Sequence, residues 1–162
     1  MSQLRPVELL CGKTLPFLAV SVVQSLLLFL AGRLLFGMSW GTEPVLLLPV
    51  IFSTSLAATV LGLLLATIVR TESQVESYST FLIVVLGGIS GCYMPRAWLP
   101  EVMKQVSLVT PHAWALIAYQ EILTRERPNL PLVAQCCGMM AAMGIIFFSI
   151  GARRFRRSAY PA

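Results

Sequence analysis

The chain has 162 residues, of which 57% are hydrophobic and 12% are charged, and its mean hydropathy is +0.80. A soluble domain of this size could not bury so much apolar surface, so the composition indicates an integral membrane protein. The net charge of +5 does not indicate nucleic-acid binding, because four of the twelve basic residues form a run directly after the last apolar segment (Arg153, Arg154, Arg156 and Arg157). A run in that place is typical of a stop signal on the cytoplasmic side of a membrane.

The first apolar segment covers residues 14–36 and follows a short amphipathic lead-in, residues 1–13. It is long enough to cross a bilayer as one helix. Pro16 falls in the expected first turn, where a missing backbone N–H is tolerated. Gln24 lies in mid-segment, and we interpret it as a hydrogen-bonding partner of a neighbouring helix in preference to a substrate contact. Arg33 lies near the far end, where its side chain can extend to the membrane interface.

The lead-in ends in a glycine, lysine and threonine, which resembles the end of a phosphate-binding loop. That motif also needs a glycine at position 7, which is Val7 here, so we reject a nucleotide site. The four cysteines have neither metal-ligand spacing nor the pattern of a disulfide framework. We therefore interpret the cysteines as small packing residues and expect no cofactor.

The second apolar segment covers residues 45–69, after a short turn in which Trp40 is expected at the membrane interface. Small residues recur at every fourth position of this segment, at Ala58, Gly62 and Ala66. Such a stripe lets another helix approach closely, so we interpret these three residues as helix-packing positions.

A polar loop, residues 70–77, separates this segment from the third, residues 78–93. The third segment contains Gly87 and Gly91, whose spacing predicts a second helix-packing face. Because glycine also weakens a helix, a kink at this point is the alternative interpretation.

Residues 94–118 are too short and too polar to cross a bilayer, yet too apolar for a free loop. Pro95, Pro100 and Pro111 divide them into short amphipathic pieces. We predict a re-entrant helical hairpin, which is stable at membrane depth only when it packs against protein or lines a wet cavity. Trp114 is expected to anchor the returning arm at the interface.

Residues 119–131 are polar and end the outer segment, and the fourth apolar segment covers residues 132–152. The predicted fold is therefore all-α: a single membrane domain over residues 1–162, with four spans and an outer hairpin. Placing both termini inside puts seven basic residues on the inner side (Arg5, Lys13, Arg70 and the four of the tail) and four outside (Arg96, Lys104, Arg125 and Arg127). This bias predicts cytoplasmic termini in a multi-pass protein of the cell membrane.

The sequence gives little support to catalysis. It has no aspartate, one histidine, and glutamates that all fall outside the apolar segments. A membrane hydrolase or metalloenzyme would need clustered acidic or histidine side chains, or a nucleophile beside a base. We interpret the one histidine, His112, as a packing residue of the hairpin.

The order of these segments resembles the C-terminal half of an ABC transporter permease of the type-2 exporter class. The residues that carry most of the resemblance are in the outer segment: Pro95, Leu99, Pro100, Ser107, Thr110, Pro111 and Trp114. Complete permeases of this class have six spans, so the resemblance implies that the first two are absent here. Either a separate chain supplies them or the sequence is the C-terminal part of a longer permease.

The resemblance implies a translocation subunit, not an enzyme, that works as a homodimer or heterodimer in the lipid bilayer with a cytoplasmic ABC ATPase. It assigns ATPase docking to Arg5, Pro6, Glu8, Glu72 and Glu76, and an outer gate to Pro95, Leu99, Pro100, Pro111 and Trp114. The alternative is a non-transporting assembly or regulatory protein derived from a permease fragment.

Overall fold

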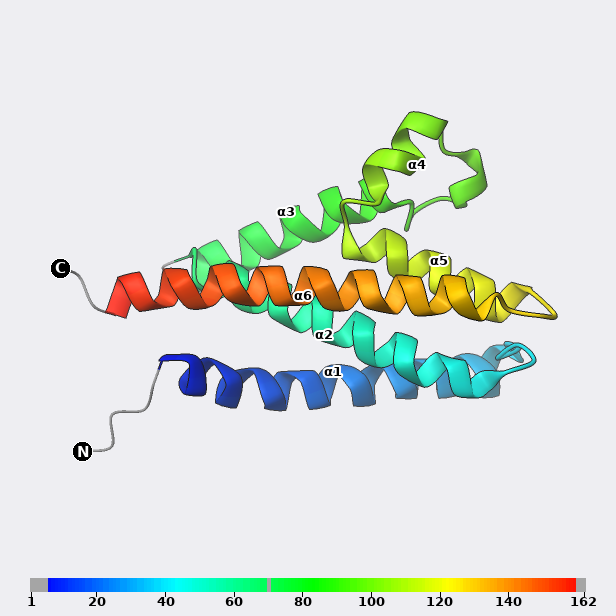
Figure 1. Cartoon of the computed structure of the whole chain (residues 1–162), viewed down its shortest axis with the longest axis horizontal. Helices are drawn as coiled ribbons and strands as arrows, with labels where there is room; N and C mark the ends of the chain where they lie inside the picture. The colour runs from blue at the N-terminus through cyan, green and yellow to red at the C-terminus, as the bar shows by residue number, and fades with distance from the viewer. Residues whose placement is uncertain (1–5, 70, 160–162) are drawn as a thin grey trace.

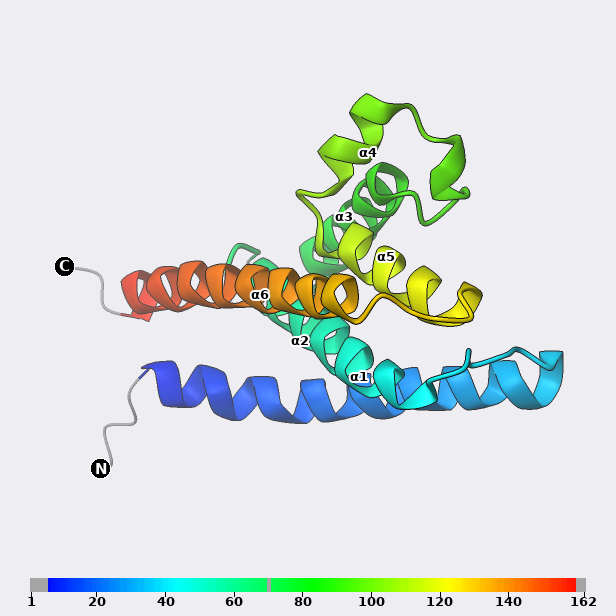
Figure 2. The same ribbon diagram turned by 45° about the vertical axis from the view of Figure 1, so that its right-hand side comes forward.

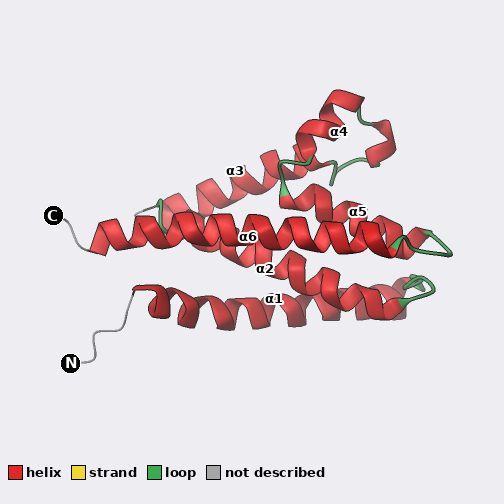
Figure 3. Ribbon diagram, in the orientation of Figure 1, coloured by secondary structure: helices red, strands yellow, loops and turns green. Residues whose placement is uncertain are grey.

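The computed structural model describes the backbone of residues 6–69 and 71–159, and the side chains of residues 12, 14–69 and 71–155. This part of the chain is helical and contains no strand (Figure 1, Figure 3). The elements are α1 (Pro6–Phe36), η1 (Pro44–Leu46), α2 (Leu47–Ala66), α3 (Glu72–Ser90), η2 (Arg96–Trp98), α4 (Glu101–Ser107), α5 (Pro111–Thr124) and α6 (Leu130–Ala159). The all-α membrane bundle predicted from the sequence is confirmed.

Three stretches in the described residues are long and apolar enough to cross a membrane: Thr14–Phe36, Pro44–Ala66 and Leu130–Phe155. They correspond to the first, second and fourth predicted spans. The helix α1 begins earlier than expected, because the lead-in from Pro6 onward continues into the span. Pro16 therefore lies inside the helix and not in its first turn, and it cannot donate a hydrogen bond to the carbonyl of Gly12.

The helix α3 is not among these three candidate spans. It begins at Glu72, so most of the predicted polar loop is helical, because the Thr71 side chain accepts a hydrogen bond from the backbone N–H of Gln74 and caps the first turn. The apolar part of α3, from Tyr78 to Ser90, is about 20 Å long at 1.5 Å per residue, against a hydrocarbon core of about 30 Å. The fourth span stays a prediction.

The helix α3 also ends earlier than the predicted third span. Gly91 follows its last residue in the left-handed conformation, with φ of 86°, and the N–H of Cys92 bonds to the carbonyl of Gly87 at 3.0 Å. This is a glycine C-cap. The helix thus stops three residues before Tyr93, and Gly91 serves the turn instead of a helix face.

The helices α2, α5 and α6 form the core (Figure 1). Fully buried side chains there include Val50, Ile122, Cys136 and Met140. The helix α1 lies along one side of the bundle and leaves most of its apolar side chains exposed. It begins at the same end of the molecule at which α6 ends (Figure 1, Figure 2).

The predicted outer segment is the least regular part of the molecule. Its short elements η2 and α4 stand out from the bundle beside the end of α3, whereas α5 packs against α2 and α6 (Figure 1, Figure 2). The helix α5 extends to Thr124, beyond the predicted hairpin end at residue 118. The sequence suggested a polar linker from Tyr119, but the polar residues here form the last turns of an amphipathic helix.

Candidate functional site

The prolines of the outer segment lie where its short helices start. Pro95 and Pro100 precede η2 and α4, and Pro111 is the first residue of α5, a position that needs no N–H donor. The prediction that these three prolines divide the segment into short helical pieces is therefore correct. Leu99, between the two short helices, is buried and lies against the turn at Gly91.

One arginine connects the two ends of the protruding piece. The guanidinium of Arg96 donates to the Ser107 hydroxyl at 2.8 Å and to the Lys104 carbonyl at 3.1 Å. Lys104 also pairs with Glu101 at 2.7 Å on the exposed side of α4. Because Arg96 binds the C-terminal turn of α4, η2 and α4 form one closed unit. The sequence did not indicate this contact, which joins residues eleven positions apart.

The outward face of this unit is apolar. Trp98, Val102 and Val109 are each more than 70% exposed, and Val106 is 48% exposed. We define these four residues as the hairpin face. Side chains of this kind need a lipid or protein environment, since exposed apolar clusters of this type mark interaction surfaces.

The junction between α4 and α5 is rigid. The Thr110 side chain accepts from the N–H of Ala113 and donates to the carbonyl of Ser107, which caps α5. The Trp114 indole donates to the carbonyl of Leu108 at 2.8 Å. Trp114 is 9% exposed and belongs to the core, so its expected role as an interfacial anchor is wrong. Its ring packs between helices, and its N–H is satisfied inside the protein.

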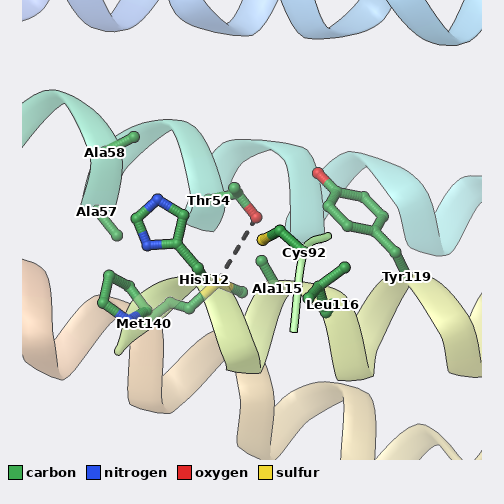
Figure 4. Close-up of a pocket in the computed structure, with 10 residues that line it drawn as sticks. Thr54, Ala57, Ala58, Cys92, His112, Ala115, Leu116, Tyr119 and Met140 are labelled. Carbon is green, nitrogen blue, oxygen red and sulfur yellow. Dashed lines mark hydrogen bonds between the residues drawn. The ribbon is translucent and has the colours of Figure 1, made fainter. Parts of the chain in front are cut away.

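A cavity of about 210 Å³ lies between α2, α5, α6 and the turn after α3. Figure 4 shows His112 and Cys92 in the space between α2 and α5, with Thr54 and Tyr119 beside them. This cavity could not be predicted from the sequence, because its lining comes from four separate stretches of the chain.

The described members of the predicted ATPase-docking set lie at one end of the molecule. Glu72 and Glu76 are exposed on the first turns of α3, and α3 starts at the end where α1 begins and α6 ends (Figure 1). Arg5 lies outside the described residues, and the side chains of Pro6 and Glu8 are not described. Their docking role stays a prediction.

Within the part of the chain that the structure describes, no other helix covers the predicted packing stripe. Ala58, Gly62 and Ala66 are all exposed, and a Cβ atom on Gly62 would meet no neighbour within 4 Å. The close approach of α2 and α6 occurs elsewhere, where Gly144 and Gly151 face α2. A Cβ atom on Gly87 would contact the Tyr93 ring, so this glycine makes room for a neighbour within its own chain.

Long apolar helices around a tight core, with proline-bounded short helices beside them, define a multi-pass membrane protein. The chain belongs to the family described as ABC-2 family transporter protein, whose sequence model matches residues 1–153. The resemblance inferred from the outer segment is thereby confirmed.

Two relatives are similar to the chain over part of their length. It is 26% identical to the linearmycin resistance permease protein LnrN of Bacillus subtilis, over 92% of this chain and 38% of the relative. It is 38% identical to a UPF0060 membrane protein of Psychrobacter cryohalolentis, over 32% of this chain and 46% of the relative. The chain thus spans less than half the length of either relative. No solved structure matches.

Proposed function

We propose that the chain is a translocation part of an ATP-driven ABC exporter and that a separate cytoplasmic ATPase supplies the energy. The observation that carries the proposal is the family match over residues 1–153 on a bundle with three candidate membrane spans. The relative named as a linearmycin resistance permease supports a permease role. Linearmycin is therefore one compound to test as cargo.

The ATPase contact would involve the end of the bundle where α1 begins. Arg5, Pro6 and Glu8 precede or open α1, and the exposed carboxylates of Glu72 and Glu76 open α3 at that same end. Charged groups at exposed helix starts suit a contact with another protein, because complementary charges on the two surfaces speed the encounter and fix its register.

A second permease chain would cover the uncovered faces. Ala58, Gly62 and Ala66 leave a smooth stripe on α2, and most side chains of α3 are exposed. Small residues allow close helix contacts in membranes. The second chain of a homodimer or of a heterodimer could cover this surface equally well.

The experiment is site-specific photo-cross-linking in membranes of the source cell. A photoreactive residue replaces Glu72 or Glu76, and a matched control replaces Trp98, which lies in the protruding outer unit. We expect the first two positions, and not Trp98, to capture a protein that carries a phosphate-binding loop. Capture of no such protein, or ATP hydrolysis by the purified chain alone, would contradict the proposal and favour the non-transporting alternative.

A further inference from the structure

We infer that the cavity at His112 is a binding site for part of a neutral, mainly apolar molecule that carries a hydroxyl or amide group. The assignment of this molecule as cargo rests on the proposed permease function. The observations are the polar groups of the cavity, its size, its lack of charge and its rigid frame.

One polar atom that faces the cavity lacks a hydrogen-bond partner within the described part of the chain. The His112 Nδ1 atom is buried and has no hydrogen-bond partner among the described residues. The Thr54 hydroxyl also faces the cavity, where it is engaged by the sulfur of Met140 at 3.5 Å and by the side chain of Tyr119. A buried polar atom without a partner is costly, and proteins rarely keep one unless a ligand, a water molecule or a function accounts for it.

The remaining lining is apolar and uncharged. Ala57, Ala115, Leu116 and Met140 form walls, and none of the described residues around the cavity is charged. An ion entering such a site would lose its hydration without gaining a counter-charge. Apolar walls with a few oriented polar groups are typical of small-molecule sites. The occupant is therefore neutral.

The size of the cavity limits the occupant to a fragment. Its volume of about 210 Å³ is smaller than the roughly 300–1,000 Å³ of sites that enclose a drug-sized molecule. A hydrocarbon segment with one hydroxyl group fits, and the rest of a larger molecule would extend along the bundle.

The frame of the cavity is already formed. His112 is the second residue of α5, two positions after the Thr110 cap, and the Trp114 indole bonds to the backbone of the same turn. A preformed site reduces the entropy lost on binding. The His112 ring is thus held between α2 and α5, as Figure 4 shows.

The experiment measures protection of Cys92, a free and exposed thiol that lines the cavity. The purified chain in nanodiscs is alkylated with a maleimide in the presence of 1-decanol, decanoate or decylammonium, and peptide mass spectrometry reports each thiol separately. We expect decanol to slow the alkylation of Cys92. The two ions should need concentrations higher by on the order of 100-fold, because their charge is unpaired in the cavity.

The variant His112→Phe keeps a ring and removes the nitrogen atoms. It should weaken decanol protection by about 2- to 10-fold, the contribution of one hydrogen bond. The control Gln120→Leu, at an exposed position on the same helix, should leave protection unchanged. A cysteine introduced at Val109, which is 76% exposed and outside the cavity, should react at the same rate with and without decanol.

Three results would overturn the inference: no protection of Cys92, equal protection by all three compounds, or full protection in a His112→Phe protein whose thermal melting matches the parent. The test needs no ATPase and no transport. A negative result in the alkylation experiment therefore leaves the cross-linking result valid. A negative result in the cross-linking experiment likewise leaves the binding result valid.

Discussion

Gly41 lies in the turn between α1 and α2 with φ of 75°, a conformation that side chains disfavour. A Cβ atom at this position would overlap the carbonyl oxygen of Ile122, in the core helix α5. The close approach therefore needs glycine for two reasons, its backbone conformation and the absence of a side chain.

The variant Gly41→Ala should consequently lose stability through both effects. The left-handed conformation costs about 1–2 kcal/mol for an ordinary residue, and forcing an atom into a packed site costs about 1–3 kcal/mol more. The matched control is Gly37→Ala, since Gly37 has φ of 64° but no neighbour within 4 Å of an added Cβ. Thermal unfolding in detergent compares the two. Equal losses would show that the contact with Ile122 is unimportant.

At the level of residues, the sequence predicted local contacts better than distant ones. The proline positions of the outer segment could be assigned because a proline limits its own backbone and that of its neighbour. The role of Gly91 could not be assigned, because a glycine in a packing stripe and a glycine C-cap have the same sequence appearance. The Arg96 contact with Ser107 depends on how the chain turns between them.

Two glycines of α6 face α2 at short distance. Added Cβ atoms on Gly144 and Gly151 would lie 3.7–4.0 Å from atoms of Leu56, Ala57 and Leu64. These are ordinary contact distances, so alanine fits there and a larger side chain does not. A third glycine of the same helix, Gly138, has no neighbour within 4 Å.

We therefore expect Gly151→Leu to separate the two helices and lower the thermal stability, whereas Gly138→Leu should have little effect. Packing terms in membranes are often about 1–2 kcal/mol, so a moderate drop in melting temperature is expected. Both variants should still insert, because leucine raises the apolar character of α6. Equal melting temperatures would indicate that α6 can move away from α2 without cost.

At the level of elements, long apolar segments were predictable and amphipathic ones were not. Spans 14–36, 45–69 and 132–152 each correspond to a candidate span, because segment length and apolar character dominate there. The last turns of α5 contain Glu121, which is 5% exposed and accepts from the N–H of Asn129 at 3.0 Å. In the sequence, this glutamate looks like an exposed loop residue, because its burial and its backbone hydrogen bond depend on the folded structure.

For the whole molecule, the start of α1 and the end of α6 share one end of the bundle (Figure 1). The bias of basic residues predicts that this end lies in the cytoplasm. A membrane-impermeant thiol reagent on intact cells should therefore label the exposed Cys92 and leave Cys11 unlabelled until the membrane is opened. Strong labelling of Cys11 in sealed cells would show that the orientation is inverted.

We propose that the outer unit of η2 and α4 moves as a gate. Arg96 closes it into one unit, and it has limited contact with the bundle apart from α3. Its apolar hairpin face is exposed in the single chain. If two copies pair across a common axis, these faces would meet above the path of the cargo, and they must separate for the cargo to leave.

A cross-link between the two hairpin faces distinguishes a gate from a fixed cover. The variant Val102→Cys, in a Cys92→Ser background, places one thiol on each hairpin face, because Val102 is 71% exposed. We expect oxidation to stop export by the assembled complex, and reduction to restore it, since a closed pair of hairpins blocks the exit. The control Val45→Cys, at an exposed position before α2, should leave export unchanged after oxidation. Export that continues with the Val102 cross-link complete would identify the hairpin as a static cover.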